Sequence, residues 1–136
     1  LMADDSDIPG MVKELTGGAG VAAVYDSVGK DTFMTSLDCL RPHGVMVTFG
    51  NASGPVEPFS PAELAARGSL YVTRPTLFHF VETRAKLLAA AEELFAFIND
   101  ARPTIRIGQR YALKDAAQAH RDLEARKTTG STILLP

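Results

Sequence analysis

Short apolar runs alternate with helix-like patterns over the first part of this chain. The runs at residues 21–25, 45–49 and 69–73 each end at a turn, as buried parallel strands do. Apolar residues at helical spacing predict helices before the first run, between the first two runs, and ahead of the third. This alternation, with short connections, predicts parallel strands joined by right-handed crossovers. The expected fold class is therefore α/β, with half of a doubly wound, Rossmann-type sheet.

Three helix boundaries rest on particular residues. The first helix carries an apolar face and is expected to end at the glycine pair 17–18. The second is expected to include Leu40 on its apolar face and to close at residues 41–44, Arg-Pro-His-Gly. Ser60 and Glu63 have capping-box spacing with a proline between them, which predicts the start of a short third helix.

The last part of the chain has a different character. An apolar stripe from Leu87 to Ile98 predicts a helix of roughly 15 residues that begins near Thr83. Beyond a break at residues 99–104, the pattern predicts a strand near residues 105–111, a helix over residues 114–126 and a strand over residues 132–135. This tail has no obvious place in the predicted parallel sheet, so we expect it to belong to another structural unit.

Composition narrows the class of protein. The chain of 136 residues is 46% hydrophobic and carries a net charge of −2, so it is long enough for one domain with a core. No basic stripe favours nucleic acid, and charges interrupt the apolar runs before they reach membrane-spanning length. The single cysteine, Cys39, excludes an internal disulfide and makes no zinc site alone. No secretory leader is visible, so the cytoplasm is the expected compartment, and the acidic start at residues 1–7 indicates either a piece of a longer chain or a flexible tail.

Residues 18–23, Gly-Ala-Gly-Val-Ala-Ala, match the dinucleotide-binding fingerprint by letter only. That fingerprint must follow a strand and open a helix, so that backbone N–H groups meet the pyrophosphate. Here the segment follows a predicted helix and opens a predicted strand, which favours a helix stop and strand entry. No other turn fits, so if the chain binds a dinucleotide, the predicted half-sheet would hold the nicotinamide end and not the pyrophosphate.

Polar residues past the carboxyl ends of the strands are the first ligand-site candidates. Residues 49–53, Phe-Gly-Asn-Ala-Ser, follow a predicted strand at the edge where open α/β sheets bind small molecules. A plain strand exit is the alternative there. Asp26 and Ser27 hold the same place after the first predicted strand, although we favour a turn that caps the next helix. The histidines lack metal-ligand spacing and no nucleophile–base pair is visible, so no metal site and no catalytic residue is predicted.

Five segments carry a resemblance to a known family: residues 24–32 (VYDSVGKDT), 36–42 (SLDCLRP), 49–54 (FGNASG), 68–77 (GSLYVTRPTL) and 119–131 (AHRDLEARKTTGS). Together they closely resemble the NADPH:quinone oxidoreductases, the zeta-crystallin-like, zinc-free branch of the medium-chain dehydrogenase/reductase superfamily. The likeness covers nearly the whole chain but only the C-terminal part of a family member. It implies that residues 1–100 are the second half of the nucleotide-binding domain. Residues 101–136 would return to complete the catalytic, GroES-like domain.

The resemblance also implies a cofactor, NADPH, and a set of residues that contact it. Ser27 would lie near the adenosine side of NADPH. The strand end whose backbone contacts the carboxamide of the nicotinamide would be formed by Val72, Thr73 and Arg74. Arg126 would reach the cofactor from the returning tail. The segment under the nicotinamide ribose would be Phe49, Gly50, Asn51 and Ala52.

The expected function is hydride transfer from NADPH to quinones or similar conjugated carbonyls. Family members associate near the strand at residues 69–73, so a homodimer is expected. The pyrophosphate turn and the upstream catalytic domain are missing from these residues, and we expect the chain alone to be inactive. A non-catalytic nucleotide-binding or dimerisation module is the alternative, and a methyltransferase-like sheet is a weaker one.

Overall fold

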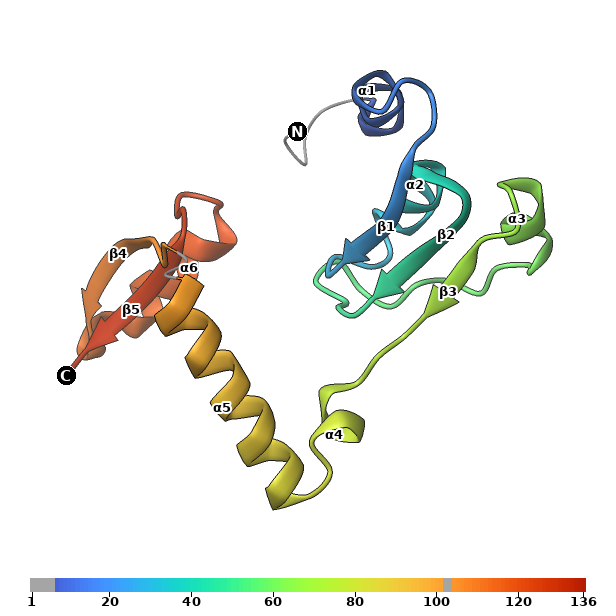
Figure 1. The fold of residues 1–136 in the computed structure, drawn as a ribbon. Coiled ribbons are helices and arrows are strands. Elements are labelled where there is room, and N and C mark those ends of the chain that lie inside the picture. Colours follow the sequence, from blue (N-terminus) through green and yellow to red (C-terminus); the bar gives the residue numbers. More distant parts are fainter. Residues whose placement is uncertain (1–6, 102–103) are drawn as a thin grey trace. The chain divides into compact units, whose positions relative to one another are not determined.

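The computed structural model describes residues 7–101 and 104–136, and the chain divides into two compact units, Leu1–Thr83 and Arg84–Pro136. The first contains a three-stranded sheet and the second a two-stranded sheet, and every strand pair is parallel (Figure 1). The α/β class with parallel strands is thereby confirmed. The boundary between the units precedes the long helix, whereas the predicted domain boundary follows it, so the domain assignment stays a prediction.

The first unit follows the predicted alternation of strands and helices. Parallel pairing joins β1 to β2 and β2 to β3, in the order β1-β2-β3. Asp26 lies opposite Thr48, and Val47 lies opposite Thr73. The carboxyl ends of the three strands therefore meet at one edge of the sheet. The elements are α1 (Ile8–Leu15), β1 (Val21–Asp26), α2 (Phe33–Asp38), β2 (Leu40–Thr48), α3 (Ala62–Ala66), β3 (Tyr71–Thr73) and α4 (Leu77–Phe80).

One face of this sheet carries the core of the unit. Side chains of β2 alternate, so that Met46 is fully buried while its neighbours Val45 and Val47 are half-buried. The opposite face leaves Tyr25 and Tyr71 exposed, at 74% and 61%. The apolar run in β2 is typical of a strand covered on both faces, and within this unit one face is covered. The buried cluster consists of Phe33, Leu37, Leu40, Met46 and Leu70.

The predicted end of the second helix was wrong. The helix stops at Asp38, and Leu40 begins β2 opposite Val21. Residues 41–44 lie within β2 instead of closing the helix, and the strand is irregular there, with His43 at a φ of +61°. Leu40 still reaches the core, because an apolar side chain can be buried from either element.

Local signals around the third helix were partly misleading. The helix exists, but the Ser60 hydroxyl accepts from the amide of Ala62 at 3.2 Å and not from that of Glu63, so the capping box is wrong. The Glu63 carboxylate instead pairs with Arg67, one turn further on. The short α4 was not predicted.

The glycines of the false fingerprint have the structural role that the sequence favoured. They lie between the end of α1 and the start of β1. Gly20 has a φ of +83°, and a Cβ there would come within 2.8 Å of the carbonyl oxygen of Cys39. Its amide donates to the Thr16 hydroxyl at 2.9 Å, so this turn is occupied by protein contacts.

The second unit holds the predicted strand–helix–strand tail. The parallel pair β4–β5 forms its own sheet, apart from the three-stranded one. Tyr111 on β4 donates its hydroxyl proton to Asp122 on α6 at 3.0 Å, which ties helix to sheet. Within the described residues, no helix is long and apolar enough to cross a membrane. The elements are α5 (Arg84–Ala101), β4 (Ile107–Ala112), the 3₁₀ helix η1 (Leu113–Asp115), α6 (Ala116–Glu124) and β5 (Ser131–Leu135).

Candidate functional site

The carboxyl ends of the strands and the loops that follow them form a connected edge of the first unit. We call residues 26–29, 49–54 and 72–74 the carboxyl rim. The first two segments are joined by backbone bonds from the amide of Phe49 to the carbonyl of Asp26 (2.8 Å) and from the amide of Ala52 to that of Ser27 (3.2 Å). The amide of Ser53 reaches the carbonyl of Val28 at 2.8 Å. The two loops are therefore held against each other along their length.

Asp26 stabilises the first loop from inside. The residue is 4% exposed, and its carboxylate accepts from the amides of Val28 (2.7 Å) and Gly29 (3.0 Å). The hydroxyls of Thr32 and Ser36 add bonds of 2.7 and 2.9 Å. Burial by itself would raise the pKa of Asp26, but these donors outweigh burial and hold the pKa below its ordinary value. The turn interpretation of Asp26 is confirmed, because its carboxylate accepts from amides two and three residues further on. The predicted cap of the next helix was wrong, because α2 begins after Thr32 and no side chain caps its first amides.

Gly50 allows the two loops to approach closely. A Cβ at this position would overlap the carbonyl oxygen of Ser27. The obstacle is backbone, which cannot move aside as a flexible side chain would. A residue without a side chain is therefore required here for the rim to close.

The third strand is tied to the rim by Arg74. Pairing between β2 and β3 ends at Val47 and Thr73. One position further, the Arg74 guanidinium donates to the carbonyl oxygen of Thr48 at 2.9 Å. This bond extends the contact between the two strands beyond their ladder and holds an exposed cationic side chain at the carboxyl edge.

A cavity of about 320 Å³ opens at this edge. The predicted residues Asn51, Val72 and Arg74 line it, together with Thr48. Thr48 is 6% exposed, and its hydroxyl has no hydrogen-bond partner within the described residues. Apolar walls with a few polar groups are typical of a small-molecule site. The remaining lining residues are Phe33, Pro55, Val56 and Phe59.

The sequence did not predict Thr48 or, apart from Val72, the apolar residues that line this cavity. Thr48 carried no signal, because a threonine at the end of an apolar strand is common. Phe59 belongs to a loop, yet it packs on Phe33 of α2 with ring centroids 4.9 Å apart. Only the folded chain brings these residues together.

The predicted site residues of the first unit are gathered at the rim. Ser27, Asn51 and Ala52 are exposed there, and Phe49 is half exposed. Arg126 lies in the second unit, exposed in the turn after α6 with a φ of +56°. The cofactor roles assigned to all of these residues stay predictions.

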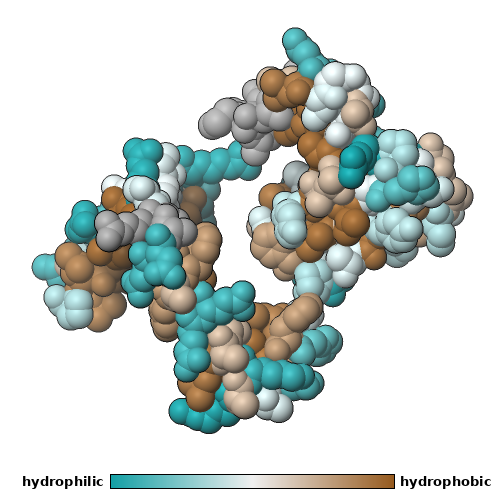
Figure 2. Space-filling view, in the orientation of Figure 1, coloured by the Kyte–Doolittle hydropathy of each residue, from teal (hydrophilic) through white to brown (hydrophobic). Residues whose placement is uncertain are grey.

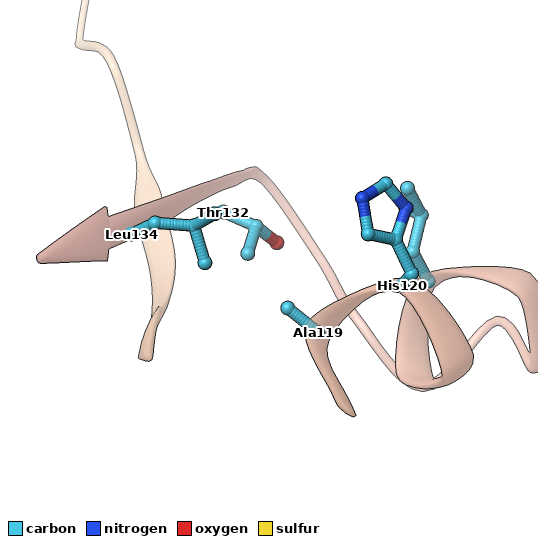
Figure 3. A pocket seen from close by; sticks show the side chains of 5 residues that line it. Ala119, His120, Thr132 and Leu134 are labelled. Carbon is cyan, nitrogen blue, oxygen red and sulfur yellow. The ribbon is translucent and has the colours of Figure 1, made fainter. Parts of the chain in front are cut away.

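The second unit has a smaller cavity of about 180 Å³ (Figure 3). His120 extends from α6, and Thr132 and Leu134 face it from β5. The lining is mainly apolar, with no ionisable partner beside the imidazole. No group of three or more potential metal-ligating side chains occurs anywhere within residues 7–101 and 104–136. The rim of the first unit is therefore the better candidate for a ligand site.

Known proteins match this chain over almost its whole length. Residues 3–134 match the family described as zinc-binding dehydrogenase. A quinone oxidoreductase of Pseudomonas aeruginosa is 57% identical over 125 residues, which cover 92% of this chain and 38% of that protein.

Solved structures of similar proteins also match this chain over almost its whole length. A mycobacterial protein in complex with NADPH is 53% identical with a TM-score of 0.86, over 98% of this chain and 42% of that one. The quinone oxidoreductase of Escherichia coli in complex with NADPH is 46% identical with a TM-score of 0.89, over 100% of this chain and 42% of that one. This chain thus spans about two fifths of the length of these relatives. It belongs to the zinc-binding dehydrogenase family of the medium-chain dehydrogenase/reductase superfamily and is similar to the C-terminal part of its quinone oxidoreductases.

Proposed function

We propose that this chain is part of an oxidoreductase that transfers a hydride from NADPH to quinones or similar conjugated carbonyls. The observation that carries the proposal is the carboxyl rim, which gathers the residues that match cofactor-contacting positions of the family. The comparisons support the proposal, because similar proteins are quinone oxidoreductases and two similar structures hold NADPH.

The rim has features that fit a dinucleotide. Gly50 lets the backbone of one loop lie directly against the other. Asn51 and Arg74 bring an amide and a guanidinium to the 320 Å³ cavity. We assign Ser27 to the adenosine side, residues 49–52 to the nicotinamide ribose and residues 72–74 to the carboxamide. Arg126 would contribute from the second unit.

The chemistry divides between cofactor and protein. NADPH, when bound, supplies the hydride, and the protein holds it in place and excludes water. Hydride addition would leave negative charge on the quinone oxygen, and a proton from bulk solvent would complete the hydroquinone once the site reopens. No side chain of the rim is assigned as a proton donor, so the contribution of these residues is binding and orientation.

Three further assignments belong to the same proposal. The whole protein would be a homodimer that associates near β3, whose outer edge is unpaired in the three-stranded sheet. Residues 1–100 would complete the nucleotide-binding domain, and residues 101–136 the catalytic domain. A single free cysteine, Cys39, is consistent with the cytoplasm as the compartment.

A chimera tests the proposal. The C-terminal segment of the Pseudomonas aeruginosa relative is replaced by this chain, and the purified protein is titrated with NADPH and NADH by fluorescence. Reduction of 1,4-benzoquinone is then followed by loss of NADPH absorbance. We expect saturable binding of NADPH and steady turnover.

Controls separate the outcomes. The unmodified relative shows that the assay works, and circular dichroism shows that the chimera is folded. A folded chimera that binds NADPH without turnover would favour the non-catalytic nucleotide-binding module. A folded chimera that binds neither dinucleotide would overturn the proposal.

A further inference from the structure

Within the carboxyl rim, the hydroxyl of Ser53 bonds to the loop that follows β1. Ser53 donates from Oγ to the carbonyl oxygen of Val28 at 2.9 Å and accepts from the amide of Asp31 at 3.0 Å. Its own amide donates to the same carbonyl of Val28 at 2.8 Å. One residue of the second loop therefore makes three hydrogen bonds to the first loop.

Neighbouring residues of the same loop have the opposite orientation. Asn51 lines the cavity, and Ala52 is exposed. Between Phe49 and Gly54, Ser53 is the residue whose side chain bonds to the first loop within the described part of the chain. The turn is closed further by the amide of Gly54, which donates to the carbonyl of Asn51 at 3.0 Å. Ser53 thus closes the loop from which Asn51 lines the cavity.

We propose that Ser53 is a positioning residue: its hydroxyl locks residues 49–52 against the loop after β1 and so presents a preformed rim to the cofactor. A loop that is already ordered loses less conformational entropy when a ligand binds. Ser53 therefore raises cofactor affinity without touching the cofactor. This inference rests on the proposed function, because the cofactor is the ligand that the rim would hold.

The chosen variants remove or keep the hydroxyl. Ser53→Ala removes both side-chain bonds, whereas Ser53→Thr keeps a hydroxyl at the same position. Ser60→Ala is the matched control, because the Ser60 hydroxyl bonds to the exposed amide of Ala62, outside the rim. Each substitution is made in this chain and in the chimera described above.

Two measurements decide the matter. In this chain, hydrogen exchange should be faster at the amides of Asp31 and Ala52 in Ser53→Ala than in the other two variants. In the chimera, Ser53→Ala should raise KM for NADPH roughly three- to tenfold, the factor expected for the net loss of about one hydrogen bond. The kcat should stay within roughly twofold, and Ser53→Thr should restore KM.

The outcomes are distinguishable. An unchanged KM in Ser53→Ala, with NADPH still bound by the unsubstituted chimera, would overturn the positioning role. A fall in apparent kcat at unchanged KM together with a lowered Tm would overturn it too, since general unfolding reduces the amount of active enzyme without changing its affinity. If the unsubstituted chimera binds no NADPH, it is the proposed function that fails. The role of the Ser53 hydroxyl in holding the loop would still be tested in that case, because unchanged hydrogen exchange in Ser53→Ala would contradict it.

Discussion

Asp26 and Ser27 are adjacent at the end of β1, but their side chains have different environments. Asp26 turns inward and satisfies four donors, while Ser27 is exposed and offers its carbonyl to the second loop. Sequence alone left open whether Asp26 faces a ligand or the protein. The buried carboxylate settles that question, because ligand contact would require it to abandon its bonds.

Replacement of Asp26 by asparagine should lower the free energy of unfolding at pH 7 by about 1–3 kcal/mol, because the donors around it lose a charged acceptor. The folded-state pKa of Asp26 lies below its ordinary value of 3.8, so its contribution is present above pH 3.8 and is lost as the pH falls through the folded pKa. Urea unfolding at pH 7, 5 and 3 checks this. A difference between wild type and variant that is as large at pH 3 as at pH 7 would contradict it.

Gly50→Ala should open the rim, because the added Cβ would overlap the Ser27 carbonyl oxygen. We expect a loss of stability of about 1–3 kcal/mol and weaker NADPH binding in the chimera. Gly17→Ala is the control: its φ is +61°, but nothing lies within 4 Å of the added Cβ. The control should lose about 1 kcal/mol from backbone strain and keep its NADPH affinity. Thermal unfolding and fluorescence titration measure the two effects.

At the scale of elements, the sheet depends on α2 more than on α1. Leu37 on α2 is fully buried against the sheet, whereas Leu15 at the end of α1 is 77% exposed. Both leucines belong to apolar helical faces in the sequence, and the pattern does not rank them. Burial in the folded unit ranks the two leucines, because an apolar side chain stabilises the fold in proportion to the surface that it removes from water.

Leu37→Ala should therefore destabilise the chain by about 2–5 kcal/mol, as expected for a cavity in a packed core. Leu15→Ala, the same change at an exposed site, should shift stability by less than about 0.5 kcal/mol. Chemical denaturation of both variants under one set of conditions makes the comparison. Equal effects would mean that α1 and α2 pack alike.

At the scale of the whole molecule, apolar surface remains open. The uncovered sheet face exposes Tyr25 and Tyr71, and α4 exposes Leu77, Phe78 and Phe80 at 69%, 77% and 66%. Figure 2 shows hydrophobic side chains at the surface of both units. Apolar patches of this kind are typical of surfaces that another polypeptide covers.

We therefore expect the 14.6 kDa chain by itself to associate and to bind a hydrophobic dye. Analytical ultracentrifugation over a concentration series should show species larger than the monomer. In the chimera, dye binding per molecule should fall, because we expect the rest of the relative to cover these faces. A chain that stays monomeric at high concentration without binding dye would refute the expectation.

Local patterns in the sequence were sufficient for the order of the strands and of the longer helices, the parallel sheet, the separate tail and the edge at which Ser27, Asn51 and Thr73 gather. Those features follow from side-chain periodicity and from the handedness of crossovers, which act over short stretches of chain. Only tertiary structure decided that Leu40 belongs to a strand, that Asp26 faces inward, and that Ser53 and Arg74 bind backbone carbonyls of other segments. Ser53 and Val28 are 25 positions apart in the sequence, and Arg74 and Thr48 are 26 positions apart. The geometry of these contacts depends on how the strands pack together, which no local stretch of sequence encodes.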